Sequence, residues 1–491
     1  MPFTSIHFYI FLGLVFFFNW FVNFKKASLQ NLILLIAGYI FYGFWSWHYL
    51  LILIFISLFN YVIGLLLQKF NSHFRRISLF VLALIIDIGS LAYFKYYHFF
   101  IKEFAALLGV FGISSHISSL SLILPVGISF YIFLQISYIT DVYRKKIIAS
   151  GNLKDTLLAF SFFPIILAGP IQRPQLLLPQ LKTKRVFSYS LAVEGLRQIL
   201  WGLFMKMVVA DNLAPVVNDA FKHYYSSTGS NLFIGVVFFA IQLYADFAGY
   251  SEIAIGASKL FGIHLIRNFS YPYFAKNIAD FWKRWHISLT SWFRDYVFLP
   301  IAYSLSGKIR SERIMFISTE ILIYIAGISV TWLLTGLWHG ANLTYIAWGA
   351  IHGFFLIVHQ IVKKPKKKLL KKLHIKQGNV FISIFERLYM FCIILTAWVF
   401  FRSDSIALAF TYFRKMLNPS LFSIPKNIPL VTIVIVTVFF IIEVLQRNKQ
   451  YTLQIDYLKL PRILRWSIYY AILISLLYLG GHNQVFIYLQ Y

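Results

Sequence analysis

Long apolar runs separated by short polar connections make up most of the chain. A helix needs about 20 mostly apolar residues to cross the hydrocarbon core of a bilayer. By that criterion the sequence predicts crossings near residues 6–24, 29–47, 49–68, 77–95, 121–140, 190–210, 231–256, 317–336, 341–362, 381–401, 429–446 and 465–482. We therefore expect an all-α polytopic membrane protein with about 11–12 transmembrane helices.

The charge pattern predicts how these spans are oriented. Lysine and arginine gather in the connections, at Lys25–Lys26, Lys69 to Arg76, Arg144 to Lys146, Lys182 to Arg185, residues 363–372 and Arg447 to Arg465. Basic loops stay in the cytoplasm, next to anionic lipid. Placing every cluster there leaves both termini outside, provided that residues 97–118 and 156–172 do not cross. The expected location is the cell inner (cytoplasmic) membrane, with basic loops cytoplasmic.

Composition favours the same class of protein. Of 491 residues, 59% are hydrophobic and only 13% are charged, whereas soluble domains carry about 25% charged residues. The net charge of +28 follows from the basic loops, so nucleic-acid binding is not expected. The first segment has no basic n-region, which argues against a removable signal peptide. We expect a single domain over residues 1–491, with a catalytic core at about 121–362.

Several kinds of chemistry lack a signature in the sequence. Cys392 is the single cysteine, which excludes an intrachain disulfide and a cysteine metal cluster. P-loop, GxSxG and HExxH motifs are absent, so ATP hydrolysis, serine-hydrolase and metalloprotease chemistry are not supported. We expect no metal and no bound cofactor.

One apolar segment is rich in helix breakers. Between residues 156 and 180 the sequence contains Pro164, Gly169-Pro170, Pro174 and Pro179, too many for an ordinary span. Irregular backbone at membrane depth is tolerated only where protein or a water-filled cavity satisfies its polar groups. We interpret residues 156–172 as a re-entrant element lining a cavity, with a surface loop as the alternative.

The long connection from 256 to 316 is unusually aromatic. At helical spacing Trp282, Trp285, Leu289, Trp292 and Tyr296 form one stripe. Such a helix is expected to lie at the interface, with its aromatic rings at headgroup level. His286 borders this stripe, about 40° from Trp282, and either faces the protein or serves as an ordinary interface residue.

Two polar side chains in apolar regions are candidates for a functional role. His339 follows Trp338 in an apolar region, and an intramembrane histidine is a functional candidate by default; the alternative is a neutral imidazole hydrogen-bonded between helices. Asp246 needs a buried partner, for which arginine or histidine from another span is expected. A structural network between helices is the alternative there. His352 and His359 are interpreted as packing or interface residues.

Nine segments together resemble one protein family. They are AYFKYYHFF (92–100), LPVGISFYIFLQISYITDVYR (124–144), LAGPIQRPQLLLPQ (167–180), KMVVADNLAP (206–215), YADFAGYSEIAIGASKLFGI (244–263), WHISLTSWFRD (285–295), GLWHGAN (336–342), AWVFFRSDS (397–405) and the terminal FIYLQY. In this order they resemble the membrane-bound O-acyltransferases, specifically the bacterial alginate O-acetyltransferase-like branch. Ala248 stands where that branch is expected to have serine.

The resemblance implies a helical fold around a central tunnel, and transfer of an acetyl group from a cytoplasmic thioester, acetyl-CoA, to an extracytoplasmic polysaccharide. It implies His339 and His286 as catalytic residues. It also implies a separate periplasmic partner of the SGNH-hydrolase type, because no such domain is fused here. The acceptor polymer, alginate-like or peptidoglycan, stays open.

A mechanism follows as a hypothesis. Desolvation favours a neutral histidine, so His339 would take the proton of the acceptor hydroxyl. Asn342 would orient the imidazole or the thioester oxygen, and Arg294, with Lys283 and Arg284, would suit the phosphates of coenzyme A. The remaining residues expected to bind or orient substrate are Trp285, Trp292, Asp295, Trp338 and Asp246. The alternatives are a teichoic-acid D-alanyl transferase fed by a carrier protein, and a transporter or channel.

Overall fold

The computed structural model describes residues 1–22, 27–111, 124–314, 316–376, 378–480, 484, 486 and 487. Several sequence predictions lie outside these residues in whole or in part. They are the basic pair Lys25–Lys26, the ends of the predicted segments 6–24, 97–118 and 465–482, the start of 121–140, and the last four residues of the FIYLQY motif. The described chain divides into two compact units.

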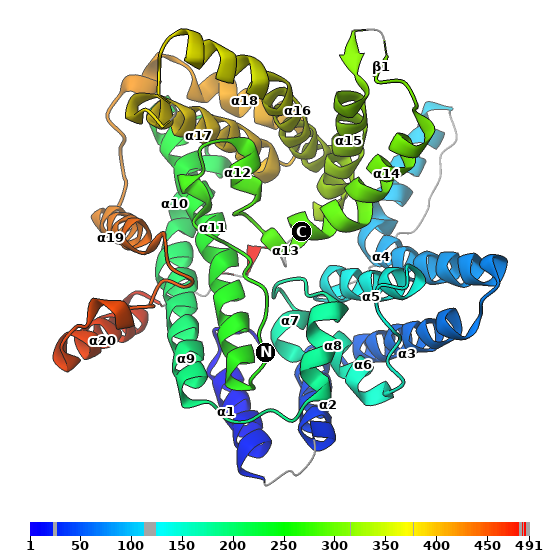
Figure 1. Ribbon diagram of the computed structural model, residues 1–491. Coiled ribbons are helices and arrows are strands. Elements are labelled where there is room, and N and C mark those ends of the chain that lie inside the picture. Colours follow the sequence, from blue (N-terminus) through cyan, green and yellow to red (C-terminus); the bar gives the residue numbers. More distant parts are fainter. Residues whose placement is uncertain are drawn as a thin grey trace. The chain divides into compact units, whose positions relative to one another are not determined.

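Unit 1 comprises Met1–Leu203, Gly249–Ile266 and Leu453–Leu473. Its helices are α1 (Ile6–Phe21), α2 (Ala27–Gly43), α3 (Trp47–Lys69), α4 (His73–Val110), α5 (Ile128–Tyr143), α6 (Leu153–Ser161), α7 (Phe163–Ile166), α8 (Pro174–Lys182), α9 (Tyr189–Leu203), the 3-10 turn η5 (Asp456–Leu458) and most of α20 (Arg462–Leu479). Within it α3, α4 and α5 pack against one another (Figure 1).

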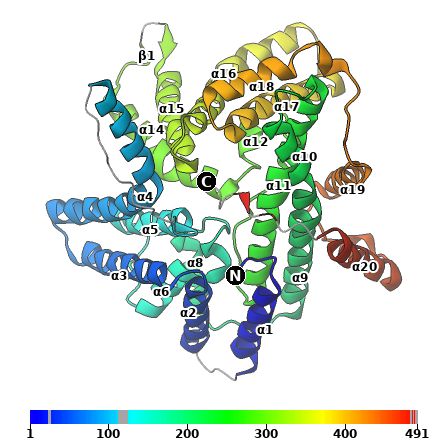
Figure 2. The same ribbon diagram turned by 180° about the vertical axis from the view of Figure 1, so that it is seen from behind.

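Unit 2 comprises Phe204–Ala248, Arg267–Thr452 and Ile474–Tyr491. Its elements are the π-helix η1 (Phe204–Ala210), α10 (Asp211–Lys222), η2 (Pro272–Phe274), α12 (Ile278–Trp282), α13 (Ile287–Phe293), the π-helix η3 (Arg294–Phe298), α14 (Leu299–Lys308), the antiparallel strands β1 (Arg313–Ile314) and β2 (Ile317–Ser318), α15 (Thr319–His339), α16 (Leu343–Lys372), α17 (Val380–Arg402), α18 (Ile406–Met416), η4 (Pro419–Phe422) and α19 (Leu430–Gln446). Helix α11 (Gly229–Leu260) contributes to both units. Helices α16, α17 and α18 lie side by side in both views (Figures 1 and 2).

The helices confirm an all-α polytopic membrane protein. Within the described residues, 8 helices are long and apolar enough to cross a membrane, and three shorter apolar helices match the predicted crossings at 6–24, 29–47 and 429–446. The prediction at 121–140 was wrong in its bounds, because α5 begins at Ile128 and nearly all of its 16 residues are buried. A helix enclosed by protein is apolar all round, so its sequence resembles that of a span.

The proline-rich segment is broken into short helices, as its composition indicates. Helices α6 and α7 end before an irregular stretch, and α8 begins at Pro174. Most of residues 155–174 are buried in unit 1. Asn31 of α2 reaches this segment by donating to the Asp155 carboxylate at 2.8 Å. The re-entrant character of residues 156–172 stays a prediction.

The aromatic segment 282–296 is not one helix. Helix α12 ends at Trp282, and α13 begins only after His286, whose φ of +42° lies in the left-handed region. The predicted continuous stripe, and with it the position of His286 on a helical wheel, was therefore wrong. The aromatic side chains Trp282, Trp285 and Trp292 are nevertheless buried in unit 2.

Glycines set the close crossing of α15 and α16. A Cβ atom on Gly349 would lie 2.3 Å from the Trp332 carbonyl oxygen, and one on Gly336 would lie 2.4 Å from that of Tyr345. Only glycine allows backbones to approach so closely, as is common between helices in membranes. This crossing brings the end of α15, which carries His339, against the first turns of α16.

Candidate functional site

His339 is the last residue of α15 and is enclosed by aromatic rings from three helices. Its side chain is 4% exposed. The imidazole centroid lies 4.7 Å from that of Trp338, 4.8 Å from that of Trp348 on α16, and 5.2 Å from that of Phe401 on α17, each in an edge-on arrangement. Helix α15 ends here because Gly340 adopts an extended conformation. The protein thus presents this imidazole from a helix terminus inside an apolar enclosure.

His286 is buried at the break between α12 and α13, with 1% of its surface exposed. Its Nδ1 lies 3.1 Å from the Oδ1 of Asn268. That oxygen also accepts from the backbone N–H and the hydroxyl of Ser288, which identifies it as the acceptor. Nδ1 therefore donates, and the lone pair of the neutral ring resides on Nε2. His286 is held in the tautomer whose Nε2 accepts a proton.

Burial also sets the charge of this histidine. Desolvation lowers the pKa of His286 from 6.5 to about 3, because removal from water penalises the imidazolium. His286 lies outside the eight candidate membrane spans. It is consequently neutral at physiological pH, as a proton acceptor must be.

Trp338 brings the two predicted catalytic histidines together. Its ring centroid lies 6.0 Å from that of His286 and 4.7 Å from that of His339. Since Trp338 is itself buried, both imidazoles contact one enclosed indole. The two sequence motifs that contain the histidines therefore meet in unit 2, although His286 and His339 lie 53 positions apart along the chain.

Trp285 directly precedes His286 in the sequence and packs against the residues around it. Its ring stacks on Phe281 at 5.5 Å and meets Phe269 edge-on at 5.2 Å. Phe269 in turn stacks on His286 at 6.2 Å. Trp285 thus packs the segment that carries Asn268, and its predicted role in substrate binding is not tested by these contacts.

The structure places Asn342 at the start of α16. Rather than facing His339 from the next helical turn, Asn342 caps α16, where its Oδ1 accepts from the Thr344 N–H at 3.0 Å. Its Nδ2 donates to the carbonyl oxygen of Asp404 at 2.9 Å. With both ends of the amide engaged in this way, Asn342 ties the start of α16 to the end of α17. The expected helical geometry was wrong, because α15 ends at His339 and residue 342 therefore does not lie one turn further along that helix. A role of Asn342 toward the substrate stays a prediction.

The structure also corrects the expected partner of Asp246. Its carboxylate lies 2.7 Å from the Nζ of Lys206, a lysine in the π-helix η1, and accepts from the Ile487 N–H at 2.8 Å. Lys206 lies equally close to Asp211 and donates to the Gln484 carbonyl at 3.1 Å. The partner is thus a lysine and not an arginine or a histidine. Asp246 belongs to an ion triad, and the next residue, Phe247, packs at 4.5 Å on His286.

The remaining predicted residues lie at the end of α13 and in η3. Trp292 is buried and packs on Tyr296 at 5.1 Å. Arg294 exposes 62% of its side chain and donates to the Asp295 carboxylate at 2.8 Å. A role for these residues toward a donor stays a prediction.

Some residues of the site were not singled out from the sequence. Asn268 orients His286 from 18 positions away, and Phe401 and Trp348 enclose His339. His352, interpreted as a packing residue, is fully buried and accepts from the indole N–H of Trp282 at 3.3 Å. Phe401 lies in the AWVFFRSDS motif, which was the sequence signal that could have identified it.

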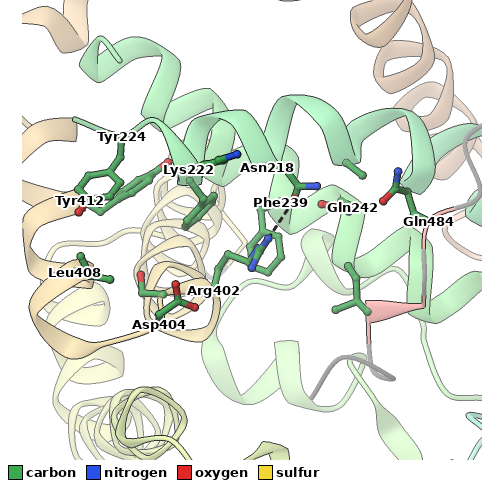
Figure 3. A pocket seen from close by; sticks show the side chains of 14 residues that line it. Asn218, Lys222, Tyr224, Phe239, Gln242, Arg402, Asp404, Leu408, Tyr412 and Gln484 are labelled. Carbon is green, nitrogen blue, oxygen red and sulfur yellow. Dashed lines mark hydrogen bonds between the residues drawn. The ribbon is translucent and has the colours of Figure 1, made fainter. Parts of the chain in front are cut away.

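Two cavities open in unit 2 at opposite ends of α17. A cavity of about 1040 Å³ lies near Val380, the start of the helix, and is lined by lysines of the 363–372 run. A cavity of about 530 Å³ lies at Arg402, the end of the helix (Figure 3). The surroundings of His339 are built from the terminal turns of α15 and α17 and the first turns of α16.

Comparison with known proteins shows the family to which the chain belongs. The membrane-bound O-acyltransferase family model matches residues 152–401, which include all nine predicted site residues. The chain is 34% identical to the "Probable alginate O-acetylase" of Pseudomonas syringae pv. tomato over 390 residues, 79% of this chain and 70% of the relative. It is 31% identical to the peptidoglycan O-acetyltransferase of Helicobacter pylori over 420 residues, 80% of this chain and 75% of the relative.

A more distant relative transfers a different group. The chain is 29% identical to the teichoic acid D-alanyltransferase of Bacillus subtilis over 255 residues, 50% of this chain and 62% of the relative. With a family match over half of the chain, and relatives above 30% identity over most of their length, the assignment is clear. The chain belongs to the membrane-bound O-acyltransferase family and is a multi-pass membrane O-acyltransferase.

Proposed function

We propose that this enzyme takes an acetyl group from acetyl-CoA on the cytoplasmic side of the inner membrane and transfers it toward an extracytoplasmic polysaccharide. The observation that carries the proposal is the pair of buried imidazoles of His286 and His339 on the ring of Trp338. The names of relatives that match 79% and 80% of this chain support acetyl as the group and a polysaccharide, alginate-like or peptidoglycan, as its destination.

In the proposed reaction His339 is the general base. An acceptor hydroxyl attacks the carbonyl carbon of the thioester while its proton passes to the imidazole. The carbon–sulfur bond then breaks, and the departing thiolate takes the proton back, leaving free coenzyme A and an acetyl ester. The apolar rings around His339 exclude water, which protects the thioester from hydrolysis. His286, held as the Nε2 acceptor by Asn268, shares the proton or holds the donor.

The lysine-lined cavity is the proposed donor entrance. Its lining includes Lys276, Lys283, Lys363, Lys367 and Lys376, against the two carboxylates of Asp280 and Glu386. Such an excess of ammonium groups suits the phosphates of coenzyme A. It also matches a cytoplasmic position for this end of the spans under the positive-inside rule. The guanidinium of exposed Arg294 is already paired with the Asp295 carboxylate. The lysine-lined cavity is therefore a better candidate for binding the donor phosphates than Arg294, the residue predicted from the sequence.

The acceptor side is proposed to involve a partner. A separate extracytoplasmic acetyltransferase of the SGNH type would complete transfer to the polymer, with the immediate acceptor hydroxyl on either a sugar or that partner. The alternative of D-alanyl transfer from a carrier protein has weaker support, because the D-alanyltransferase relative matches only 50% of this chain.

Acetyl transfer is tested with purified protein in detergent and radiolabelled acetyl-CoA. Thioester turnover is compared between the wild type, His339→Ala and His286→Ala, with exposed His223→Ala as the matched control. We expect turnover in the wild type and control, and a loss of at least about a hundredfold in the two site variants. Turnover that survives His339→Ala in folded protein contradicts the proposal, as does turnover with a D-alanyl carrier-protein thioester alone.

The donor entrance is tested by the KM for acetyl-CoA. The double variant Lys363→Gln and Lys367→Gln is expected to raise KM severalfold with little change in kcat, because these charges contact the donor and not the reacting atoms. Arg294→Gln serves as the comparison. A raised KM in Arg294→Gln, with none in the lysine variant, would place the donor phosphates at η3 instead.

A further inference from the structure

The cavity at the end of α17 has a polar and charged lining that the histidine chemistry does not use. It lies between α10, α11, α17, α18 and the segment around Gln484 (Figure 3). Its hydrophilic lining includes Asn218, Lys222, Gln242, Arg402, Asp404 and Gln484. A volume of about 530 Å³ falls in the range of pockets that bind small molecules.

Arg402 is positioned in this cavity without neutralisation of its charge. Its Nη2 donates to the amide oxygen of Asn218 at 3.0 Å, as Figure 3 shows. Its guanidinium carbon lies 5.9 Å from the ring centroid of Phe221, which stacks on Tyr412 at 4.6 Å. In the part of the chain that the structure describes, no carboxylate lies within ion-pair distance of Arg402. A fixed guanidinium held by neutral partners keeps its affinity for an anion.

The sum of charges in the lining favours a singly charged ligand. Arg402 and Lys222 are opposed by Asp404 alone among the charged residues that line the cavity. A guanidinium binds a carboxylate through two parallel hydrogen bonds. The excess of one positive charge matches one carboxylate, and the amides of Gln242 and Gln484 offer donors and acceptors to hydroxyl groups.

One wall of the cavity is anchored by the buried ion triad. Gln484 and Ile487 line the cavity, and the backbones of the same two residues bond to Lys206 and Asp246. The wall is therefore held by charged groups that cannot separate without a large desolvation cost. A preformed wall lowers the entropic cost of binding a ligand.

A second part of the lining is continuous with the histidine site. Phe401, whose ring meets His339 edge-on, directly precedes Arg402 in the sequence. The Asp404 carbonyl accepts from Asn342, three residues after His339. Residues 401–404 thus separate the two sites by the thickness of one chain segment, with Phe401 on one side and Arg402 and Asp404 on the other.

We propose that this cavity binds a carboxylate-bearing sugar of the acceptor, with Arg402 as the residue that binds the carboxylate and Lys222 as a second cation. The inference rests on the proposed function, because it takes the sugar to be the acetyl acceptor. In that function the acceptor enters at the end of the spans opposite the lysine-rich end. The rings of Phe239, Tyr224 and Tyr412 in the lining suit the apolar faces of a sugar ring. The carboxylate comes from a uronic acid or from a carboxylated glycan strand of peptidoglycan.

Binding is measured by calorimetry with detergent-purified full-length protein, so that the outcome does not depend on turnover. The probes are a uronic acid hexasaccharide, its carboxyl methyl ester, and a muramic-acid-containing tetrasaccharide. We expect at least one of the two acids to bind the wild type, the methyl ester to bind at least about tenfold more weakly, and affinity to fall as salt is raised. The acid that binds identifies the source of the carboxylate.

The variants separate the cavity from the catalytic site. Arg402→Gln is expected to weaken binding of that acid at least about tenfold, and Arg402→Lys to recover part of the loss. Exposed Arg414→Gln on α18 is the matched control and should bind as the wild type does. His339→Ala should also bind normally, so failure of the proposed catalysis is distinguishable from failure of this site. Equal binding of acid and ester, no binding of either acid, or unchanged binding in folded Arg402→Gln overturns the proposal.

Discussion

The ammonium nitrogen of Lys206 lies 2.7 Å from a carboxylate oxygen of Asp246, and both side chains are almost completely buried. Asp211 lies at the same distance from that nitrogen. The triad forms where the chain passes from α9 through the π-helix η1 into α10, and a π-helical turn of this kind is common at functional sites. It links that turn to α11 and to residues 484 and 487 of the C-terminal segment.

Loss of the central lysine should therefore be costly. Lys206→Met leaves two buried carboxylates without their cation, and we expect a loss of about 3–5 kcal/mol in the free energy of unfolding. Thermal unfolding in detergent, followed by fluorescence, measures it. Lys259→Met, which breaks the more exposed pair with Glu194, should cost no more than about 1 kcal/mol. Equal losses of unfolding free energy in the two variants would show that the buried triad stabilises the protein no more than the more exposed ion pair does.

The neutral state of His286 predicts how stability responds to acid. Its pKa is lowered from 6.5 to about 3 in the folded protein, so the unfolded chain binds the proton more readily between those values. Stability contributed by this residue is therefore complete above pH 6.5 and is lost as pH falls toward 3, by up to about 1.4 kcal/mol per pH unit.

Thermal unfolding between pH 7.5 and 4.5 measures this slope. His286→Asn carries no titrating group at that position and should lose less stability than the wild type over the same range. Parallel curves for the two proteins would mean that His286 titrates no differently in the folded and unfolded states.

The Asn268 carboxamide should control the tautomer of His286. In Asn268→Ala the Nδ1–H loses its acceptor, so Nε2 no longer holds the lone pair consistently, and we expect kcat for acyl transfer to fall at least about tenfold. Asn277→Ala is the control, because Asn277 caps α12 and its loss should cost only about 1 kcal/mol of stability. Similar kinetics in the two variants would remove the orienting role of Asn268.

The crossing of α15 and α16 should not tolerate a side chain at its glycines. In Gly349→Ala the new Cβ would lie 2.3 Å from the Trp332 carbonyl oxygen, which forces the helices apart and is expected to cost about 1–3 kcal/mol. Because this crossing positions His339, activity should fall along with the unfolding temperature.

Gly89→Ala on α4 is the matched control for that substitution. No atom lies within 4 Å of the position of its Cβ, so the change should alter stability by no more than about 1 kcal/mol. An unfolding temperature for Gly349→Ala as high as that of Gly89→Ala would contradict the close approach of the two helices.

Much of the fold was predictable because spans are specified locally. A stretch of apolar residues long enough to cross a bilayer is recognisable without knowledge of its neighbours, and most of the predicted crossings correspond to apolar helices. The exception, α5, is apolar because protein encloses it. Lipid and protein interior select the same side chains, so the sequence alone does not distinguish the two environments.

The partners of polar residues were not predictable in this way. The sequence indicated that Asp246 needs a partner, but Lys206 and Ile487 lie 40 residues before it and 241 residues after it. Nothing in a local pattern identifies a contact that is made only when distant segments pack. The break at His286 was missed for a related reason, since a left-handed residue between two short helices is stabilised by Asn268 and Ser288 and not by helix propensity.

By itself the sequence determined the class of protein and its family, and it predicted the two histidines as site residues, because hydropathy and short motifs are properties of consecutive residues. Only the tertiary structure decided that His286 and His339 meet on Trp338, that Asn342 is a helix cap, and that Arg402 faces a cavity beside the histidine site. These are relations between side chains far apart along the chain, and the physical forces that create them, burial and hydrogen bonding, act on distances in space.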